Sequence, residues 1–200
     1  MSKIAIVFVT IISCNGCGVA RQNLPVDIWI DDGFSVYEEG AIVAAIESWE
    51  LVTNEDIFNY RGRQKVADFN EDDYLDSMHV IYKVMEPNES ILSIERRIKK
   101  FYGIDPGAWA NLSDIVVLWY KFQINTECMG AEYIDDTPDC AQYGRYIYQR
   151  LRYVVTHELG HFLGMHHNNN LESVMCLENN ESYMPSPYDM EVFCEIYDDC

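Results

Sequence analysis

The most informative stretch of this chain lies toward its C-terminal end and reads His157-Glu158-Leu159-Gly160-His161-Phe162-Leu163-Gly164-Met165-His166-His167. His157 and His161 are four residues apart, so on a helix their side chains project from one face, one turn apart. Gly164 can end that helix in a left-handed conformation, after which the returning chain supplies His167. Three imidazoles leave the fourth position of a tetrahedral zinc ion open for water, and Glu158 lies beside them, free to act on that water.

The spacing also has to be weighed against a structural explanation. A bare His-Glu-x-x-His pattern occurs on helices that bind no metal. The added glycine and third histidine at fixed offsets favour zinc over that alternative. His166 is the neighbour of His167 and could compete with it for the metal. The offset favours His167, so we expect His166 to pack against the protein or to face solvent.

The whole stretch resembles the metzincin pattern His-Glu-x-x-His-x-x-Gly-x-x-His, and Ser173-Val174-Met175 resembles the Met-turn of that family. This resemblance implies that Met175 packs beneath the three imidazoles without binding zinc. Ala41–Trp49 is similar to the first helix of the matrixin branch, and Ser186–Tyr197 is similar to its closing helix. The implied fold is an α+β, metzincin-like zincin fold, in which a twisted mixed sheet packs on two long helices and a small C-terminal subdomain ends in a helix.

Two departures leave the exact metzincin branch open. Asn168 stands where matrixins usually carry serine, and Leu177 stands where astacin-like and serralysin-like members carry a tyrosine. A tyrosine fifth ligand from that position is therefore excluded, although Tyr183 could still line the cleft. The cysteine-switch motif of secreted animal matrixins is absent, so the sequence does not indicate how activity is regulated.

The N-terminal residues resemble a bacterial lipoprotein signal. A short basic start is followed by the apolar run Ile4–Ile12, which is shorter than the about 20 residues that span a bilayer. Such a run fits the hydrophobic region of a signal peptide, and the following residues up to Cys14 resemble a lipobox. The alternative is that Ile4–Ile12 forms a buried first strand.

The lipoprotein reading divides the chain into three parts. We expect a signal peptide at residues 1–13, a lipidated N-terminal tether at residues 14–24 and a metzincin-like catalytic domain at residues 25–200. A membrane anchor at Cys14 would place the protein in the cell envelope, outside the cytoplasm, at the outer membrane or the cell surface. The oligomeric state is unknown from the sequence, and a monomer is assumed.

Composition limits the classes of partner. The apolar content of 48% and the aromatic content of 13% favour a compact globule over a disordered chain. The net charge of −19 opposes nonspecific binding to nucleic acid and to anionic lipid. The charge could instead keep the protein soluble or favour basic substrates. We expect a protein or peptide substrate, whose cleavage preference the sequence does not indicate, and no nucleic acid.

With Cys14 set aside, six cysteines remain, namely Cys17, Cys128, Cys140, Cys176, Cys194 and Cys200. An even number in an exported chain favours disulfides. We prefer a pair between Cys128 and Cys140, and Cys176 could pair with Cys194 or Cys200. Zinc binding by cysteine is the alternative, but the folded body contains no Cys-x-x-Cys pair.

Periodicity predicts the main elements. Strands are expected at Pro25–Asp31, Asp56–Arg61, Met78–Met85 and Ile115–Phe122. Helices are expected at Glu38–Val52, Ser90–Tyr102 and Gln142–Leu163, with Ser90 as a possible cap of the second. The two motif histidines fall at the edge of the apolar arc of the third helix, where a buried face meets a cleft.

A calcium site is conceivable in the acidic turn before the third helix. Asp135, Asp136 and Asp139 offer the carboxylate oxygens that calcium prefers. Their spacing matches no calcium loop, and an exposed acidic turn is the commoner explanation. One catalytic zinc ion is therefore the expected cofactor.

These features together predict a zinc-dependent endopeptidase, in which Glu158 acts as general base and His157, His161 and His167 bind the metal. Substrate is expected to lie extended along a sheet edge, formed by Ile115–Phe122 or by Cys128–Ile134. The alternative is a non-catalytic, zinc-containing envelope protein that binds a partner. Hydrolysis of a substrate other than a peptide is a third possibility that the motif permits.

Overall fold

The computed structural model describes residues 22–66, 78–102, 106–110, 114–122, 138–176 and 182–197. The predicted signal peptide and the lipidated Cys14 lie outside these residues, as do Leu177, Asp135, Asp136 and most of the acidic turn. The predicted domain boundaries and cellular location therefore stay predictions. No helix in the described part of the chain combines the length and apolar character that crossing a bilayer requires.

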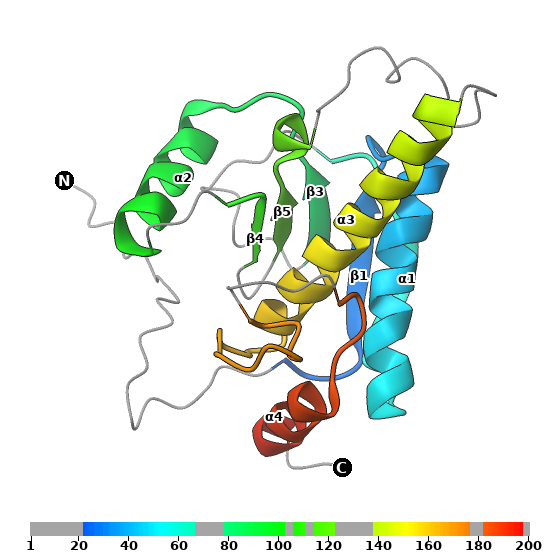
Figure 1. Ribbon diagram of the computed structural model, residues 1–200, viewed down its shortest axis with the longest axis vertical. Coiled ribbons are helices and arrows are strands. Elements are labelled where there is room, and N and C mark those ends of the chain that lie inside the picture. The colour runs from blue at the N-terminus through cyan, green and yellow to red at the C-terminus, as the bar shows by residue number, and fades with distance from the viewer. Residues whose placement is uncertain are drawn as a thin grey trace.

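A five-stranded mixed sheet forms the centre of the fold (Figure 1). Its strands are β1 (Val26–Asp31), β2 (Phe58–Gln64), β3 (His79–Lys83), β4 (Ala108–Ala110) and β5 (Ile115–Val117), in the spatial order β2-β1-β3-β5-β4. The first four in that order are parallel, and β4 runs antiparallel to β5 at the edge. The predicted strands near residues 25–31, 56–61 and 78–85 are confirmed to within a few residues.

The prediction of one strand over Ile115–Phe122 is wrong in its second half. The strand ends at Val117 and a short 3-10 helix, η2 (Trp119–Lys121), follows. The Trp119 ring stacks on the Phe122 ring with centroids 5.4 Å apart, so these aromatic side chains are buried by a tight turn instead of a pleat. A continuous apolar run is equally compatible with both conformations, which is why the pattern did not separate them.

One of the two predicted edge segments is wrong, because β5 lies between β3 and β4 and is not an edge. The other, Cys128–Ile134, lies outside the described residues and stays a prediction. The described edge on this side is β4, which the sequence analysis did not predict. Three residues are too few to show the alternation of apolar and polar side chains by which a strand is recognised.

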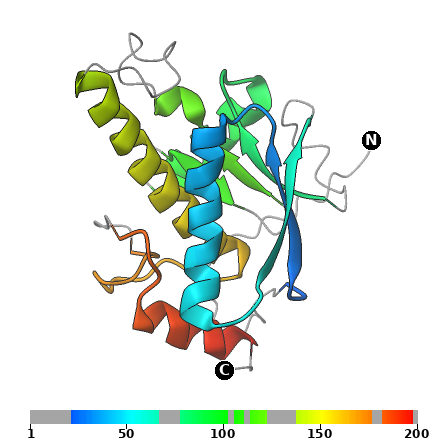
Figure 2. The ribbon, with the colours of Figure 1, turned by 90° about the vertical axis from the view of Figure 1, so that its right-hand side faces the viewer.

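Four α-helices flank the sheet in the described part of the chain: α1 (Val36–Thr53), α2 (Glu89–Tyr102), α3 (Pro138–Phe162) and α4 (Pro187–Tyr197). Helices α1 and α3 lie side by side on one face, and α4 lies across their lower ends (Figure 2). Ile115 and Val117 belong to the main core under these helices, while Val116 between them packs with Ile91 of α2. Since neighbouring strand residues point to opposite faces, α2 covers the other face of the sheet.

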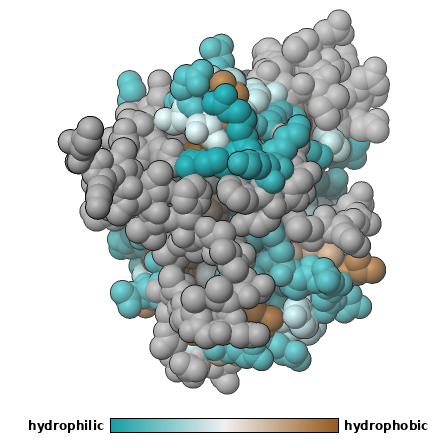
Figure 3. Space-filling model, turned by 90° about the vertical axis from the view of Figure 1, so that its left-hand side faces the viewer, coloured by the Kyte–Doolittle hydropathy of each residue, from teal (hydrophilic) through white to brown (hydrophobic). Residues whose placement is uncertain are grey.

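This arrangement confirms the predicted α+β class, with a mixed sheet on two long helices and a closing C-terminal helix. The indole N–H of Trp49 on α1 donates a hydrogen bond to the Thr156 carbonyl on α3 at 2.9 Å, which ties the two long helices together. Helix α2 is amphipathic, and the described residues visible on the side of the molecule on which it lies are mainly hydrophilic (Figure 3). Its start differs from the prediction, because the Asn88 side chain, and not Ser90, accepts a hydrogen bond from the first turn, at the Ile91 N–H.

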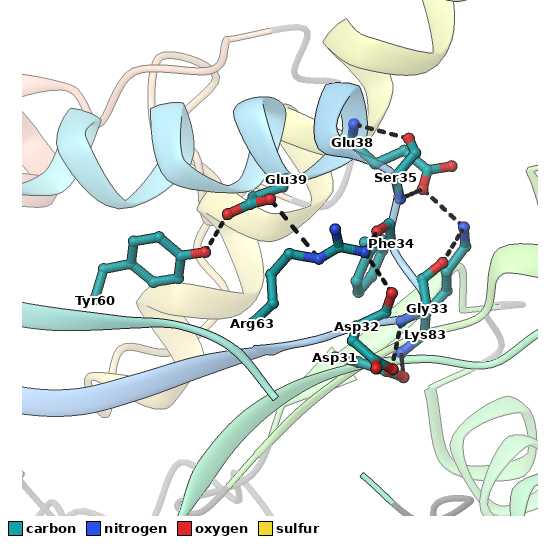
Figure 4. Close-up of polar contacts among 10 residues, drawn as sticks. All are labelled: Asp31, Asp32, Gly33, Phe34, Ser35, Glu38, Glu39, Tyr60, Arg63 and Lys83. Carbon is teal, nitrogen blue, oxygen red and sulfur yellow. Dashed lines mark hydrogen bonds and ion pairs between the residues drawn. The ribbon is translucent and has the colours of Figure 1, made fainter. Parts of the chain in front are cut away.

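A buried polar cluster fastens the start of α1 to the sheet (Figure 4). Ser35 and Glu38 form a capping box, in which the Ser35 N–H donates to the Glu38 carboxylate at 2.6 Å. The Lys83 ammonium of β3 lies 2.7 Å from the same carboxylate and donates to the Gly33 carbonyl at 3.1 Å. It also lies 4.5 Å from the centroid of the Trp119 ring. Each polar group in the cluster therefore has a partner, as buried charges require.

Candidate zinc site

The C-terminal end of α3 brings two of the predicted ligands together. Helix α3 ends at Phe162, and Gly164 follows with a φ of 88°, in the left-handed region that favours glycine. The Met165 N–H donates to the Gly160 carbonyl and the Gly164 N–H to the His161 carbonyl, both at 2.9 Å, which closes the helix in a Schellman motif. The predicted role of Gly164 in turning the chain is therefore confirmed.

This turn brings His167 back to the two histidines of the helix. The Nε2 atom of His167 lies 3.2 Å from that of His157 and 2.9 Å from that of His161. The three imidazoles form one group of potential metal ligands. His166 is exposed and takes no part in the group, in agreement with the prediction that it faces solvent.

Backbone carbonyls set the tautomers of the two helical histidines. The Nδ1 atom of His157 lies 2.6 Å from the Val174 carbonyl oxygen, and that of His161 lies 2.9 Å from the Met165 carbonyl oxygen. A carbonyl can only accept, so each Nδ1 carries the proton and each Nε2 presents a lone pair to the centre of the group. The backbone therefore orients both rings as metal-binding histidines usually are.

The group fits a zinc ion on its donor chemistry and spacing. Burial lowers the pKa of His157 and of His161, and it lowers the pKa of His167 to about 4, so the imidazoles are neutral at pH 7. Nitrogens about 2.0–2.1 Å from a tetrahedral zinc lie about 3.3 Å apart, close to the separations of these Nε2 atoms. Lone pairs that face one another at such distances repel unless a cation or a proton lies between them. A divalent ion would satisfy all three at once.

Glu158 follows His157 on α3, and its side chain contacts β4. Its side chain is buried, and one carboxylate oxygen accepts a hydrogen bond from the backbone N–H of Ala110. The other oxygen, Oε2, is buried and has no partner in the part of the chain that the structure describes. Burial raises the pKa of Glu158 to about 8, and the Ala110 N–H opposes that shift only in part. This buried carboxylate therefore keeps one oxygen that could accept a hydrogen bond.

Met175 lies beneath the helix that carries the histidines, as the family resemblance implies. It is fully buried, and a β-carbon at residue 160 would clash with its sulfur atom. Gly160 therefore permits this close approach, since a larger residue there would require the Met175 side chain to shift. The helix can then rest directly on the methionine.

Asp189 on α4 holds the Met-turn in place and was assigned no role by the sequence analysis. Its carboxylate accepts hydrogen bonds from the Val174 N–H at 3.0 Å and from the Ser173 hydroxyl. It also accepts from the N–H and the hydroxyl of Ser186, at 2.7 and 2.8 Å. Because the Val174 carbonyl orients His157, this carboxylate supports a metal ligand through one peptide unit. The spacing Ser186-x-x-Asp189 is a capping-box signal, but it does not reveal the link to the Met-turn.

Other predicted contributors are not part of the cluster. Cys176 is a free, buried thiol, so its predicted pairing with Cys194 or Cys200 is wrong. Every other pairing involves a cysteine whose side chain lies outside the described residues, and those pairings stay predictions. The ring of Tyr183 lies 5.6 Å from the guanidinium of Arg152 and makes no described contact with the histidines. The calcium prediction also falls on side chains outside the described residues.

A family model for matrixin matches residues 47–198, which is more than half of the chain. The chain is also similar to the crystal structure of archaemetzincin from Methanopyrus kandleri, with 14% identity, a TM-score of 0.47, and coverage of 86% of this chain and 96% of that one. No curated protein matches the chain in sequence. Since the matrixin model covers most of its length, the protein belongs to the matrixin family of zinc metallopeptidases, and His157, His161 and His167 are the side chains that can bind the zinc.

Proposed function

We propose that the protein is an endopeptidase that hydrolyses peptide bonds with a metal-activated water and with Glu158 as general base. The observation that supports this most directly is the buried Oε2 atom of Glu158, which has no partner among the described residues and belongs to the residue that follows the candidate ligand His157 on α3. A zinc ion held by three histidines would supply a water of lowered pKa and would polarise the scissile carbonyl.

Glu158 would accept the proton of the attacking water and pass it to the departing amine. Its burial suits both steps, because a carboxylate in a dry environment binds a proton more tightly than one in water. The two helical histidines stay neutral because burial lowers their pKa, and they stay oriented because their Nδ1–H groups donate to the Val174 and Met165 carbonyls. The lone pairs that bind the metal are thus provided without any rearrangement of the site.

The outer edge of β4, which has no neighbouring strand among the described residues, is the proposed platform for the substrate. The Gly107 carbonyl accepts from the Leu118 N–H on the β5 side at 2.9 Å, so Gly107 points inward. Backbone groups alternate along an antiparallel strand, which turns the polar groups of Ala108 and Ala110 outward. A peptide could therefore add to this edge as a further strand, which reads backbone more than side chains. Its carbonyls would pass next to Glu158.

Hydrolysis of a peptide library by purified protein tests the proposal. We expect internal cleavage that chelation abolishes and zinc restores. Glu158→Ala should remove cleavage and keep the bound zinc, because Glu158 is not a ligand. Equal cleavage by that variant would exclude Glu158 as the base. Mass measurement of the products would also define the cleavage preference.

The rival function is that of a non-catalytic, zinc-containing envelope protein that binds a partner. Stoichiometric zinc without turnover of any peptide would favour it over the endopeptidase. The buried Oε2 atom of Glu158 argues against this rival, because an unpartnered carboxylate destabilises the fold and a binding module has no use for it.

We also propose that the protein is anchored to a membrane of the cell envelope by lipidation of Cys14. The support is the basic start, the apolar run Ile4–Ile12 and the lipobox-like residues before the cysteine. Incorporation of labelled palmitate by the wild type and its loss in Cys14→Ser would support the anchor. Retention of the label by the variant would contradict it.

A further inference from the structure

We propose that the backbone N–H of Ala110 is a positioning group for the general base, holding the Glu158 carboxylate at the edge of β4. The proposal rests on the proposed function, because it assigns the group through which Glu158 would be placed for proton transfer. It adds a main-chain contribution from a strand that the metal-binding motif does not include.

The geometry of β4 leaves the Ala110 N–H available for this purpose. The backbone N–H and C=O groups of Ala108 and Ala110 point away from β5, because those of Gly107 and Trp109 take the alternate positions that point toward β5. The outward Ala110 N–H is the group that donates to Glu158. This hydrogen bond therefore forms without breaking a hydrogen bond between β4 and β5. It joins the proposed substrate platform directly to the proposed base.

Among the described residues, the Ala110 N–H is the hydrogen-bond partner of one oxygen of the Glu158 carboxylate, and the other oxygen has no partner. A glutamate side chain has several rotatable bonds, so one fixed hydrogen bond largely decides where its free oxygen points. That oxygen must come within hydrogen-bond reach of the proton that it removes. Misplacement by about 1 Å can lower a catalysed rate by about 10²-fold.

The same hydrogen bond has a consequence for the substrate. A peptide that pairs with β4 can use both outward groups of Ala108, but at Ala110 it finds the N–H already occupied by Glu158. The peptide carbonyl opposite that N–H consequently lies beside the carboxylate, unpaired with the strand. The hydrogen bond from Ala110 would thereby distinguish the peptide carbonyl that reacts from the peptide residue that pairs with Ala108.

Replacing the amide at residue 110 by an ester tests the proposal with the smallest change. Incorporation of lactic acid at position 110 removes only the N–H and keeps the methyl side chain. We expect kcat to fall about ten- to a hundredfold, the size of one hydrogen bond to a charged group, with KM and zinc content nearly unchanged. The matched control is the same ester at position 108, which also removes an outward N–H but should raise KM and leave kcat nearly unchanged.

A double-mutant cycle separates positioning from a general structural effect. In the Glu158→Ala background, the ester at 110 should cause no further loss of the residual rate, because the group that it positions is gone. An equal loss in both backgrounds would overturn the proposal, as would a wild-type kcat for the ester variant. Ala110→Pro and Ala108→Pro provide a second pair that also lacks these outward N–H groups. If the wild type itself cleaves no peptide, the proposed function fails first, whereas an active wild type with an insensitive kcat contradicts only the role of Ala110.

Discussion

Two buried glutamates, one on each long helix, have opposite surroundings. Glu38 on α1 is 3% exposed and accepts hydrogen bonds from the Ser35 N–H and the Lys83 ammonium. Glu158 on α3 is 6% exposed and accepts one backbone N–H, while its Oε2 atom has no partner. The first arrangement fastens a helix to a sheet. The second keeps a buried acceptor oxygen without a partner among the described residues, which is costly for folding and which the proposed general-base role would use.

Replacing each glutamate by glutamine should separate the two roles most strongly. We expect Glu158→Gln to lower kcat by about 10²–10⁴-fold, the usual contribution of a general base, because an amide cannot accept the proton. Glu38→Gln should leave kcat nearly unchanged. Hydrolysis of a fluorogenic peptide at matched zinc content measures both. Similar losses of kcat in the two variants would break the comparison.

Removing the partner of Glu38 should affect stability instead of activity. We expect Lys83→Ala to lower the free energy of unfolding by about 3–5 kcal/mol, because it leaves a buried carboxylate without its cation. Urea unfolding of the metal-free protein measures the change. Arg61→Ala is a suitable control, because it removes a solvent-exposed ion pair with Asp27 and should change the unfolding midpoint little. Equal effects of the two substitutions would contradict the structural role of Lys83.

Asp189 is a third buried carboxylate. Like Glu38 it is hydrogen-bonded, and unlike Glu38 it is linked to a candidate metal ligand, His157, through the Val174 peptide. We expect Asp189→Asn to weaken zinc affinity about 10- to 100-fold, because His157 is oriented by the Val174 peptide that this carboxylate holds. Competition with a chelator measures the affinity. Asp56→Asn, at an exposed position, serves as the control. Unchanged affinity in the first variant would show that the Met-turn holds its position without Asp189.

The pH dependence of stability should sharpen the contrast further. The pKa of Glu158 is raised to about 8 in the folded, metal-free protein, against about 4.3 for a free glutamate, so between these values the folded state binds more protons than the unfolded state. Stability should therefore fall as pH rises through this window, by at most about 1.4 kcal/mol per pH unit from this group.

Glu158→Gln should abolish this component of the pH dependence, because an amide does not titrate. The difference in unfolding free energy between the variant and the wild type should therefore grow from pH 5 to pH 8. Urea unfolding at several pH values in the presence of chelator provides the measurement. A difference that stays constant with pH would mean that burial does not perturb Glu158.

The metal ligands were predictable because their spacing is a property of a single helix and its cap. A separation of four residues places His157 and His161 on one face, and Gly164 permits the turn that returns His167. The long helices were predictable for the same reason, since their apolar positions recur at the helical period. Strand β4 was missed because three residues are too few to show an alternation of apolar and polar side chains. The strand predicted from Ile115 was too long because a strand and a buried turn bury aromatic side chains equally well.

By itself, the sequence determined which atoms can bind the metal, because helix geometry converts spacing into direction without any help from the rest of the chain. Only the tertiary structure decided what surrounds them: the N–H of Ala110 at Glu158, the carboxylate of Asp189 under the Met-turn and the Lys83 ammonium at Glu38. These contacts join residues from different elements, and their partners depend on strand order and helix packing, which no local pattern encodes. The difference between a partnered and an unpartnered glutamate arises at that level.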